Sequence, residues 1–140
     1  MAGNRIEIQV DVGGGLPLIE CDEEQIKQVM LNLLMNAAQA MPEGGLITVT
    51  AYKEGSEIAL SVCDEGEGVP DELASRIFDP FFTTREAGTG LGLAVVHQIV
   101  MQHGGRIEVG KNGAKGTRFT IHLPIRSGYH DETGKNIGRR

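Results

Sequence analysis

The chain has 140 residues, 40% of them hydrophobic, and a formal net charge of −6, which suits a single globular domain. The acidic balance argues against a general nucleic-acid-binding protein, which normally carries a basic face. No apolar run reaches the roughly 20 residues of a transmembrane helix, and the N-terminus lacks a signal-peptide pattern.

The N-terminal part predicts a strand followed by a long helix. Apolar residues alternate over Arg5–Val12, which is typical of a half-buried strand, and a run of three glycines ends it. From Asp22 to Met41 the apolar residues recur at i, i+3, i+4 and i+7, the pattern of a helix with one buried stripe. Asp22 and the glutamine three residues later form a capping-box pattern, and Pro42 ends the helix.

A polar ridge borders that stripe. Gln28, Asn32 and Asn36 are spaced four apart and therefore lie on one side of the helix. Because asparagine is a poor residue for a helix interior, the pair Asn32 and Asn36 indicates that something polar is bound there. The alternative is an ordinary set of polar residues at the edge of the core.

The middle of the chain predicts a hairpin and then a long irregular segment. Residues 47–51 and 58–62 alternate as two strands, and the turn between them contains Gly55. Periodicity is lost from Asp64 to Gly90, apart from a short helix expected within Pro70–Phe78. An irregular segment of this length is usually a functional lid or disordered, and its three phenylalanines favour the lid.

The C-terminal part predicts a second helix and a last hairpin. Leu91–His103 is apolar nearly all round and should be mostly buried, with Gly104–Gly105 as a left-handed cap. Arg106–Val109 and Thr117–Leu123 alternate as the hairpin. Apolar residues almost vanish after residue 125, so we expect one domain over 1–125 and a flexible tail over 126–140. Antiparallel hairpins with segregated helices favour a two-layer α+β sandwich.

Two glycine-rich motifs point to a ligand. Asp64–Gly68 (DEGEG) directly follows a strand, and its glycines allow a ligand close to the backbone, while Asp64 can accept from an exocyclic amine. The alternative is an acidic turn. Gly88–Leu93 (GTGLGL) leads into the second helix, where exposed N–H groups form an anion site. It matches neither the dinucleotide fingerprint nor a P-loop.

Other chemistry is weakly supported by the sequence. His97, His103 and His122 lack the spacing of a metal-binding motif, so core or capping roles are favoured over metal ligation. Cys21 and Cys63 also lack metal-binding spacing and are expected to be reduced core residues, with a disulfide left open. No serine or cysteine nucleophile constellation is recognisable.

In order and spacing, these motifs resemble the ATP-binding catalytic domain of sensor histidine kinases, within the gyrase, Hsp90, histidine kinase and MutL superfamily. The resemblance spans roughly residues 4 to 124 and implies a Bergerat ATP-binding fold, a two-layer α/β sandwich with a mixed, mostly antiparallel sheet, about three helices and an ATP lid. The matching segments are Asn32–Asn36 (N box), Asp64–Gly68 (first glycine box), Phe78–Phe82 (F box), Gly88–Leu93 (second glycine box) and Gly116–Thr117 (last nucleotide-contacting element).

The resemblance implies ATP and Mg²⁺ as cofactors. Asn36 would coordinate Mg²⁺, Asn32 would lie near the phosphates and their water, and Arg85 would be the lid cation for the γ-phosphate; these three form the implied catalytic set. Gln39 stands where some kinases carry a lysine, which adds weight to Arg85.

The rest of the implied ATP site concerns the base, the nucleotide backbone and the lid hinge. Asp64 would accept from the adenine amine, and Thr117 would support the adenine through water. The glycines of the first box would clear space for the nucleotide, and those of the second would form the lid hinge and offer N–H groups to phosphate. The residues concerned are Gly66, Gly68, Gly88, Thr89, Gly90, Leu91, Gly92 and Leu93.

The implied function is transfer of the γ-phosphate of Mg-ATP to a histidine on a separate dimerisation domain, for relay to a response regulator. This sequence shows no histidine motif of that domain, so we expect a partner-dependent catalytic half that is monomeric when isolated. Its expected location is cytoplasmic, with or without a membrane anchor elsewhere in the protein.

Three alternatives stay open at this point. An ATPase of the same superfamily would carry a catalytic glutamate at the position of Asn32, and asparagine cannot act as a base. A serine-kinase anti-sigma factor shares the same boxes but phosphorylates a protein serine. A nucleotide-sensing or structural pseudoenzyme is the third reading, and the intact boxes argue against it.

Overall fold

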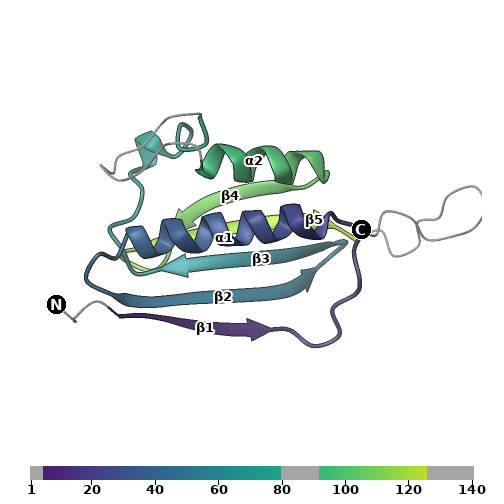
Figure 1. Ribbon diagram of the computed structural model, residues 1–140, viewed down its shortest axis with the longest axis horizontal. Coiled ribbons are helices and arrows are strands. Elements are labelled where there is room, and N and C mark those ends of the chain that lie inside the picture. Colours follow the sequence, from purple (N-terminus) through teal and green to yellow (C-terminus); the bar gives the residue numbers. More distant parts are fainter. Residues whose placement is uncertain (1–4, 80–91, 126–140) are drawn as a thin grey trace, which may run out of the picture.

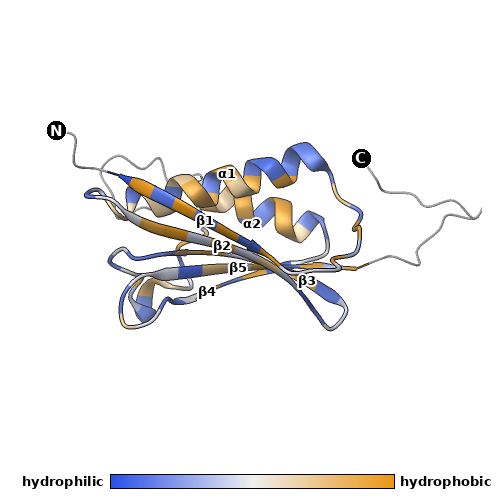
Figure 2. Ribbon diagram, turned by 90° about the horizontal axis from the view of Figure 1, so that it is seen from below, coloured by the Kyte–Doolittle hydropathy of each residue, from blue (hydrophilic) through white to orange (hydrophobic). Residues whose placement is uncertain are grey.

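The computed structural model describes residues 5–79 and 92–125. One sheet has the strand order β1-β2-β3-β5-β4, in which β1 is parallel to β2 and all other neighbours are antiparallel. Both α-helices lie on the same face of the sheet (Figures 1 and 2). The elements are β1 (Ile6–Val12), α1 (Glu23–Gln39), β2 (Gly45–Glu54), β3 (Glu57–Asp64), the 3₁₀ helix η1 (Asp71–Leu73), α2 (Gly92–Gln102), β4 (Arg106–Lys111) and β5 (Thr117–Pro124).

The predicted two-layer α+β sandwich with a mixed sheet is therefore confirmed. The described residues contain two α-helices, one fewer than the three or so helices expected, and one short 3₁₀ helix. The short helix expected within 70–78 is the 3₁₀ element. In the described part of the chain, no helix is long and apolar enough to cross a membrane.

The start of α1 confirms one half of the predicted capping box. The Asp22 carboxylate accepts from the backbone N–H groups of Glu24 and Gln25, at 3.1 and 3.3 Å. The Asp22 N–H, however, donates to His103 Nε2 at 3.0 Å, so a histidine from the end of α2 takes the place predicted for the Gln25 side chain. His103 Nδ1 lies 2.8 Å from the Ile99 carbonyl, and this histidine therefore joins the two helices.

The core lies between the helices and one face of the sheet. The buried stripe predicted for α1 is present. The prediction that the second helix is mostly buried is wrong, because only Val96, Ile99 and Val100 of α2 are buried and Met101 is 50% exposed. At the end of α2, Gly104 has a φ of +76° and the Gly105 N–H donates to the Val100 carbonyl, which confirms the predicted left-handed cap. Cys63 is buried and Cys21 is half-buried, with no disulfide between them. The core includes Val29, Leu33, Ala37, Ile47, Val62, Val96, Ile99, Val100, Phe119 and Ile121.

The prediction of a half-buried β1 is wrong for most of its apolar residues. Ile8, Val10 and Val12 are 54, 61 and 57% exposed, although their register with core residues of β2, Ile8 with Ile47 for example, places them on the face that carries the helices. A helix about 10 Å wide covers about two strands spaced roughly 4.8 Å apart. Because α1 packs on β2 and β3 and α2 packs on β4, no described helix covers the edge strand β1.

Candidate functional site

The polar ridge of α1 faces the start of α2. Gln28 Nε2 donates to Asn32 Oδ1 at 2.9 Å, and Asn32 Nδ2 donates to the Gly92 carbonyl at 3.1 Å. Asn36 lies one turn further along α1 and is half-buried. The ridge is therefore an ordered set of polar groups along the flank of α1 that meets the N-terminal end of α2.

A second polar centre lies at the end of β3, where Asp64 is only 1% exposed. Its Oδ1 atom accepts from the Gly66 N–H at 2.8 Å and from the Thr117 N–H at 3.3 Å. Thr117 is the first residue of β5 and is paired in register with Asp64. The two residues predicted to contact adenine are therefore in direct contact, and backbone donors hold the carboxylate in one orientation.

The glycines of the DEGEG motif have a packing role of their own. A Cβ atom on Gly66 would lie 2.5 Å from the carbonyl oxygen of Ala40, the C-cap of α1. Gly68 has a φ of +86° and packs on the carbonyl of Gly116, 3.2 Å from where its Cβ would be. The motif thus brings the loop after β3 against the end of α1. This close contact alone explains why a glycine is needed at position 66, whether or not a ligand binds there.

These contacts place both polar centres along one helix. Asn32 to Ala40 spans about 12 Å at 1.5 Å per residue; the Asn32 end borders α2, and the Ala40 end borders the Asp64 loop. An arrangement of this kind suits an extended ligand that has different chemistry at its two ends.

Some of the remaining predicted site residues lie in the described part of the chain, and the others lie outside it. Gly92 begins α2, and Leu93 is half-buried against the core. Arg85, Gly88, Thr89, Gly90 and Leu91 lie outside the described residues, as do Phe81 and Phe82 of the F box. Phe78, the first residue of that box, packs against the rings of His97 and Phe119, with centroid separations of 5.5 and 6.2 Å.

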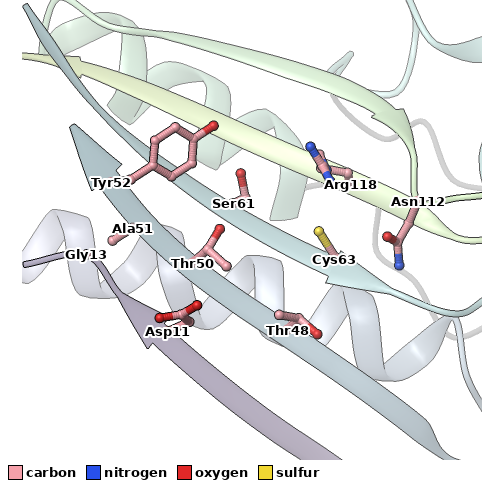
Figure 3. A pocket seen from close by; sticks show the side chains of 10 residues that line it. All are labelled: Asp11, Gly13, Thr48, Thr50, Ala51, Tyr52, Ser61, Cys63, Asn112 and Arg118. Carbon is pink, nitrogen blue, oxygen red and sulfur yellow. The ribbon is translucent and has the colours of Figure 1, made fainter. Parts of the chain in front are cut away.

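The opposite face of the sheet has its own polar features. A shallow hollow of about 420 Å³ lies over β2 and β3 and is bordered by Thr50, Ser61, Asn112 and Arg118 (Figure 3). On the same face, buried His122 lies 3.1 Å from Glu108 and 3.4 Å from Glu57. Within residues 5–79 and 92–125, no group of three His, Cys, Asp or Glu residues could hold a metal ion.

Sequence reasoning missed one residue next to Asp64. Asn112 Nδ2 donates to the Asp64 carbonyl at 2.7 Å. The sequence marks Asn112 and the glycine after it only as a turn, and no pattern relates that turn to a residue 48 positions earlier.

The comparisons with known proteins agree with this architecture. Residues 21–127 match the family model described as "Histidine kinase-, DNA gyrase B-, and HSP90-like ATPase". The chain is 45% identical over 129 residues to the sensor histidine kinase ZraS of Escherichia coli O157:H7, an alignment that covers 92% of this chain and 28% of ZraS. The chain therefore spans less than a third of the length of ZraS, and the same holds for other curated sensor kinases that it matches.

Solved structures are similar over the same region. The catalytic domain of histidine kinase ThkA has a TM-score of 0.77 and 37% identity, covering 85% of this chain and 78% of that one. Full-length ShkA in complex with AMPPNP has a TM-score of 0.76 and 37% identity, with 85% and 25% covered. Histidine kinase ThkA in complex with response regulator protein TrrA has a TM-score of 0.75 and 32% identity, with 89% of this chain and 36% of that one covered.

The family match covers most of the chain, the relatives are sensor kinases, and the fold is that of their catalytic domains. The chain therefore belongs to the family of histidine kinase-, DNA gyrase B- and HSP90-like ATPases, as an ATP-binding catalytic domain of the sensor histidine kinase type.

Proposed function

We propose that this domain binds Mg-ATP along the flank of α1 and transfers its γ-phosphate to a histidine on a separate dimerisation domain, for relay to a response regulator. The observation that carries the proposal is the pair of polar centres joined by α1, Asp64 with Thr117 at one end and the Asn32–Asn36 ridge at the other. The relatives are sensor kinases, and one similar structure contains a bound ATP analogue.

Adenine binds at the Asp64 end. Its exocyclic amine donates to the Asp64 carboxylate, and Thr117 supports the ring through a water molecule. Two backbone N–H groups already hold Asp64 Oδ1, so the carboxylate is preorganised for a base that presents a donor. Guanine presents a carbonyl oxygen at the corresponding position, and GTP should therefore bind poorly.

The phosphates bind along the Asn32–Asn36 ridge, with Mg²⁺. Mg²⁺ is usually held by one or two protein oxygens together with substrate phosphates, and the Asn36 carboxamide can supply one such oxygen. Such a site does not need a cluster of three His, Cys, Asp or Glu ligands, and the described residues contain none. The second glycine box, Gly88 to Leu93, offers N–H groups to the phosphates, and Arg85 supplies a cation to the γ-phosphate.

Asn32 favours transfer over hydrolysis. Its carboxamide accepts from Gln28 and donates to the Gly92 carbonyl, and a carboxamide cannot take a proton from water. A neutral imidazole acceptor needs no such base, because its nitrogen is already nucleophilic. The domain therefore has to supply position and charge, as in other phosphoryl transfers.

The decisive experiment mixes this domain, γ-labelled ATP and a separately made dimerisation domain of the same kinase. Label should appear on the partner as acid-labile, base-stable phosphohistidine. Asn36→Ala should abolish Mg²⁺-dependent transfer, whereas Met35→Ala should not, because Met35 is the adjacent residue of α1 and is 51% exposed.

Each other outcome assigns a different function. Acid-stable label on a serine would assign the domain to the anti-sigma kinases. Rapid phosphate release without a partner would assign it to the ATPases. Failure to bind Mg-ATP in a calorimetric titration would favour the pseudoenzyme reading. The domain boundary at 125, the monomeric state and the cytoplasmic location stay predictions.

A further inference from the structure

The hairpin between β4 and β5 contacts the main chain of Asp64. Asn112, at the start of its turn, donates from Nδ2 to the Asp64 carbonyl at 2.7 Å. At the end of the turn, Gly116 has a φ of +104°, and a Cβ atom there would lie 2.2 Å from the same carbonyl oxygen. Both ends of the turn are therefore packed on the backbone carbonyl of Asp64, the residue whose side chain is the buried carboxylate.

Asn112 itself lies on the other side of the sheet from the proposed nucleotide site. Its side chain borders the hollow on the open face, beyond the end of β3, next to Cys63 and Arg118 (Figure 3). The Asn32–Asn36 ridge belongs to the helix layer on the opposite face. An effect of Asn112 on a nucleotide bound there therefore passes through the main chain that it contacts: the Asp64 carbonyl at 2.7 Å and the Gly116 carbonyl at 3.4 Å.

We infer that Asn112 is a positioning residue for ATP. Its hydrogen bond to the Asp64 carbonyl fixes the backbone of Asp64 and thereby the position of the carboxylate that binds adenine. This inference rests on the proposed role of Asp64. The carboxylate is held by the Gly66 and Thr117 N–H groups through Oδ1, while sheet pairing with Thr117 and one side-chain hydrogen bond hold the Asp64 backbone. Asn112 supplies that side-chain restraint on the backbone.

The test is a double-mutant cycle on the complete chain, with Mg-ATP affinity measured by calorimetry. The worth of one neutral hydrogen bond, roughly 2- to 12-fold in an equilibrium constant, is the upper limit of the effect because the bond exists without ATP as well; Asn112→Ala should weaken ATP binding by at least about 2-fold and by no more than about 12-fold. Asn112→Asp has the same shape without the N–H donor and should weaken binding at least as much. Lys115→Ala, an exposed change in the same turn, is the matched control and should bind ATP like wild type.

Coupling to Asp64 separates positioning from a general effect on the fold. In an Asp64→Asn background the adenine contact is already impaired, so adding Asn112→Ala should weaken ATP binding by less than about a further 2-fold. The inference would be overturned if the effects of the two substitutions on ATP affinity were additive. It would also be overturned if both Asn112 variants bound ATP like wild type while Asp64→Asn bound it weakly. Either result would leave the proposed function intact. A wild-type chain that fails to bind ATP would instead refute the proposed function.

Discussion

Replacing Gly66 with alanine tests whether the loop after β3 is held against α1. The new Cβ would lie 2.5 Å from the Ala40 carbonyl oxygen and 2.7 Å from the Ala40 Cβ, much closer than ordinary van der Waals contact. Neither atom is the tip of a flexible side chain, so relief requires a shift of the loop or of the last turn of α1. The same loop shift would disturb the bond from the Gly66 N–H to Asp64 Oδ1.

The size of the effect follows from overpacking a filled site. Such changes cost about 1–3 kcal/mol in the free energy of unfolding. For a domain of this length, 1 kcal/mol corresponds to roughly 3 °C in Tm, so Gly66→Ala should lower the Tm by about 3–9 °C. Because the loop shift would displace the Gly66 N–H that donates to Asp64 Oδ1, the affinity of the folded protein for ATP should fall as well.

Gly110→Ala provides the matched control. Gly110 lies in β4, no atom is within 4 Å of its added Cβ, and its backbone is outside the left-handed region. That variant should be as stable as wild type or slightly more so, since alanine lowers the entropy of the unfolded chain. Urea unfolding and calorimetry on both variants make the comparison. Equal stability of Gly66→Ala and Gly110→Ala would refute the proposed packing constraint.

Three further predictions follow from single contacts. Asp64→Asn should weaken ATP binding roughly 10- to 150-fold, the equivalent of about 1.5–3 kcal/mol for a charge-assisted hydrogen bond; wild-type affinity by calorimetry would refute the adenine assignment. His103→Phe removes the acceptor of the Asp22 N–H and should cost about 1 kcal/mol in urea unfolding; an unchanged midpoint would mean that water replaces the histidine fully. Val10 and Val62 lie in the same row across the sheet, but Val10 is 61% exposed and Val62 is 2% exposed. Val10→Ala should therefore change the free energy of unfolding by less than about 0.5 kcal/mol, whereas Val62→Ala should lower it by about 2 kcal/mol. Equal costs would mean that β1 is covered in solution.

Local patterns were enough to predict most of the secondary structure. The spacing of apolar residues from Asp22 to Met41 predicted α1 and its buried stripe, because a helix repeats every 3.6 residues whatever surrounds it. The turn at Gly55 and the cap at Gly104 were predictable for a similar reason, since both have positive φ angles, which glycine adopts without strain. The asparagine ridge and the glycine boxes predicted a ligand site, and that assignment stays a prediction.

Tertiary structure decided which of those elements meet. The alternation in β1 predicted the face on which Val10 would lie, but not that the helix layer would stop short of the edge strand. The capping box predicted a local partner for the Asp22 N–H, and the fold supplied His103, 81 residues away. Asn112 meets Asp64 across 48 residues. Periodicity and turn chemistry act within a few residues and are readable from the sequence, whereas contacts between distant residues exist only once the sheet register and the helix packing bring them together.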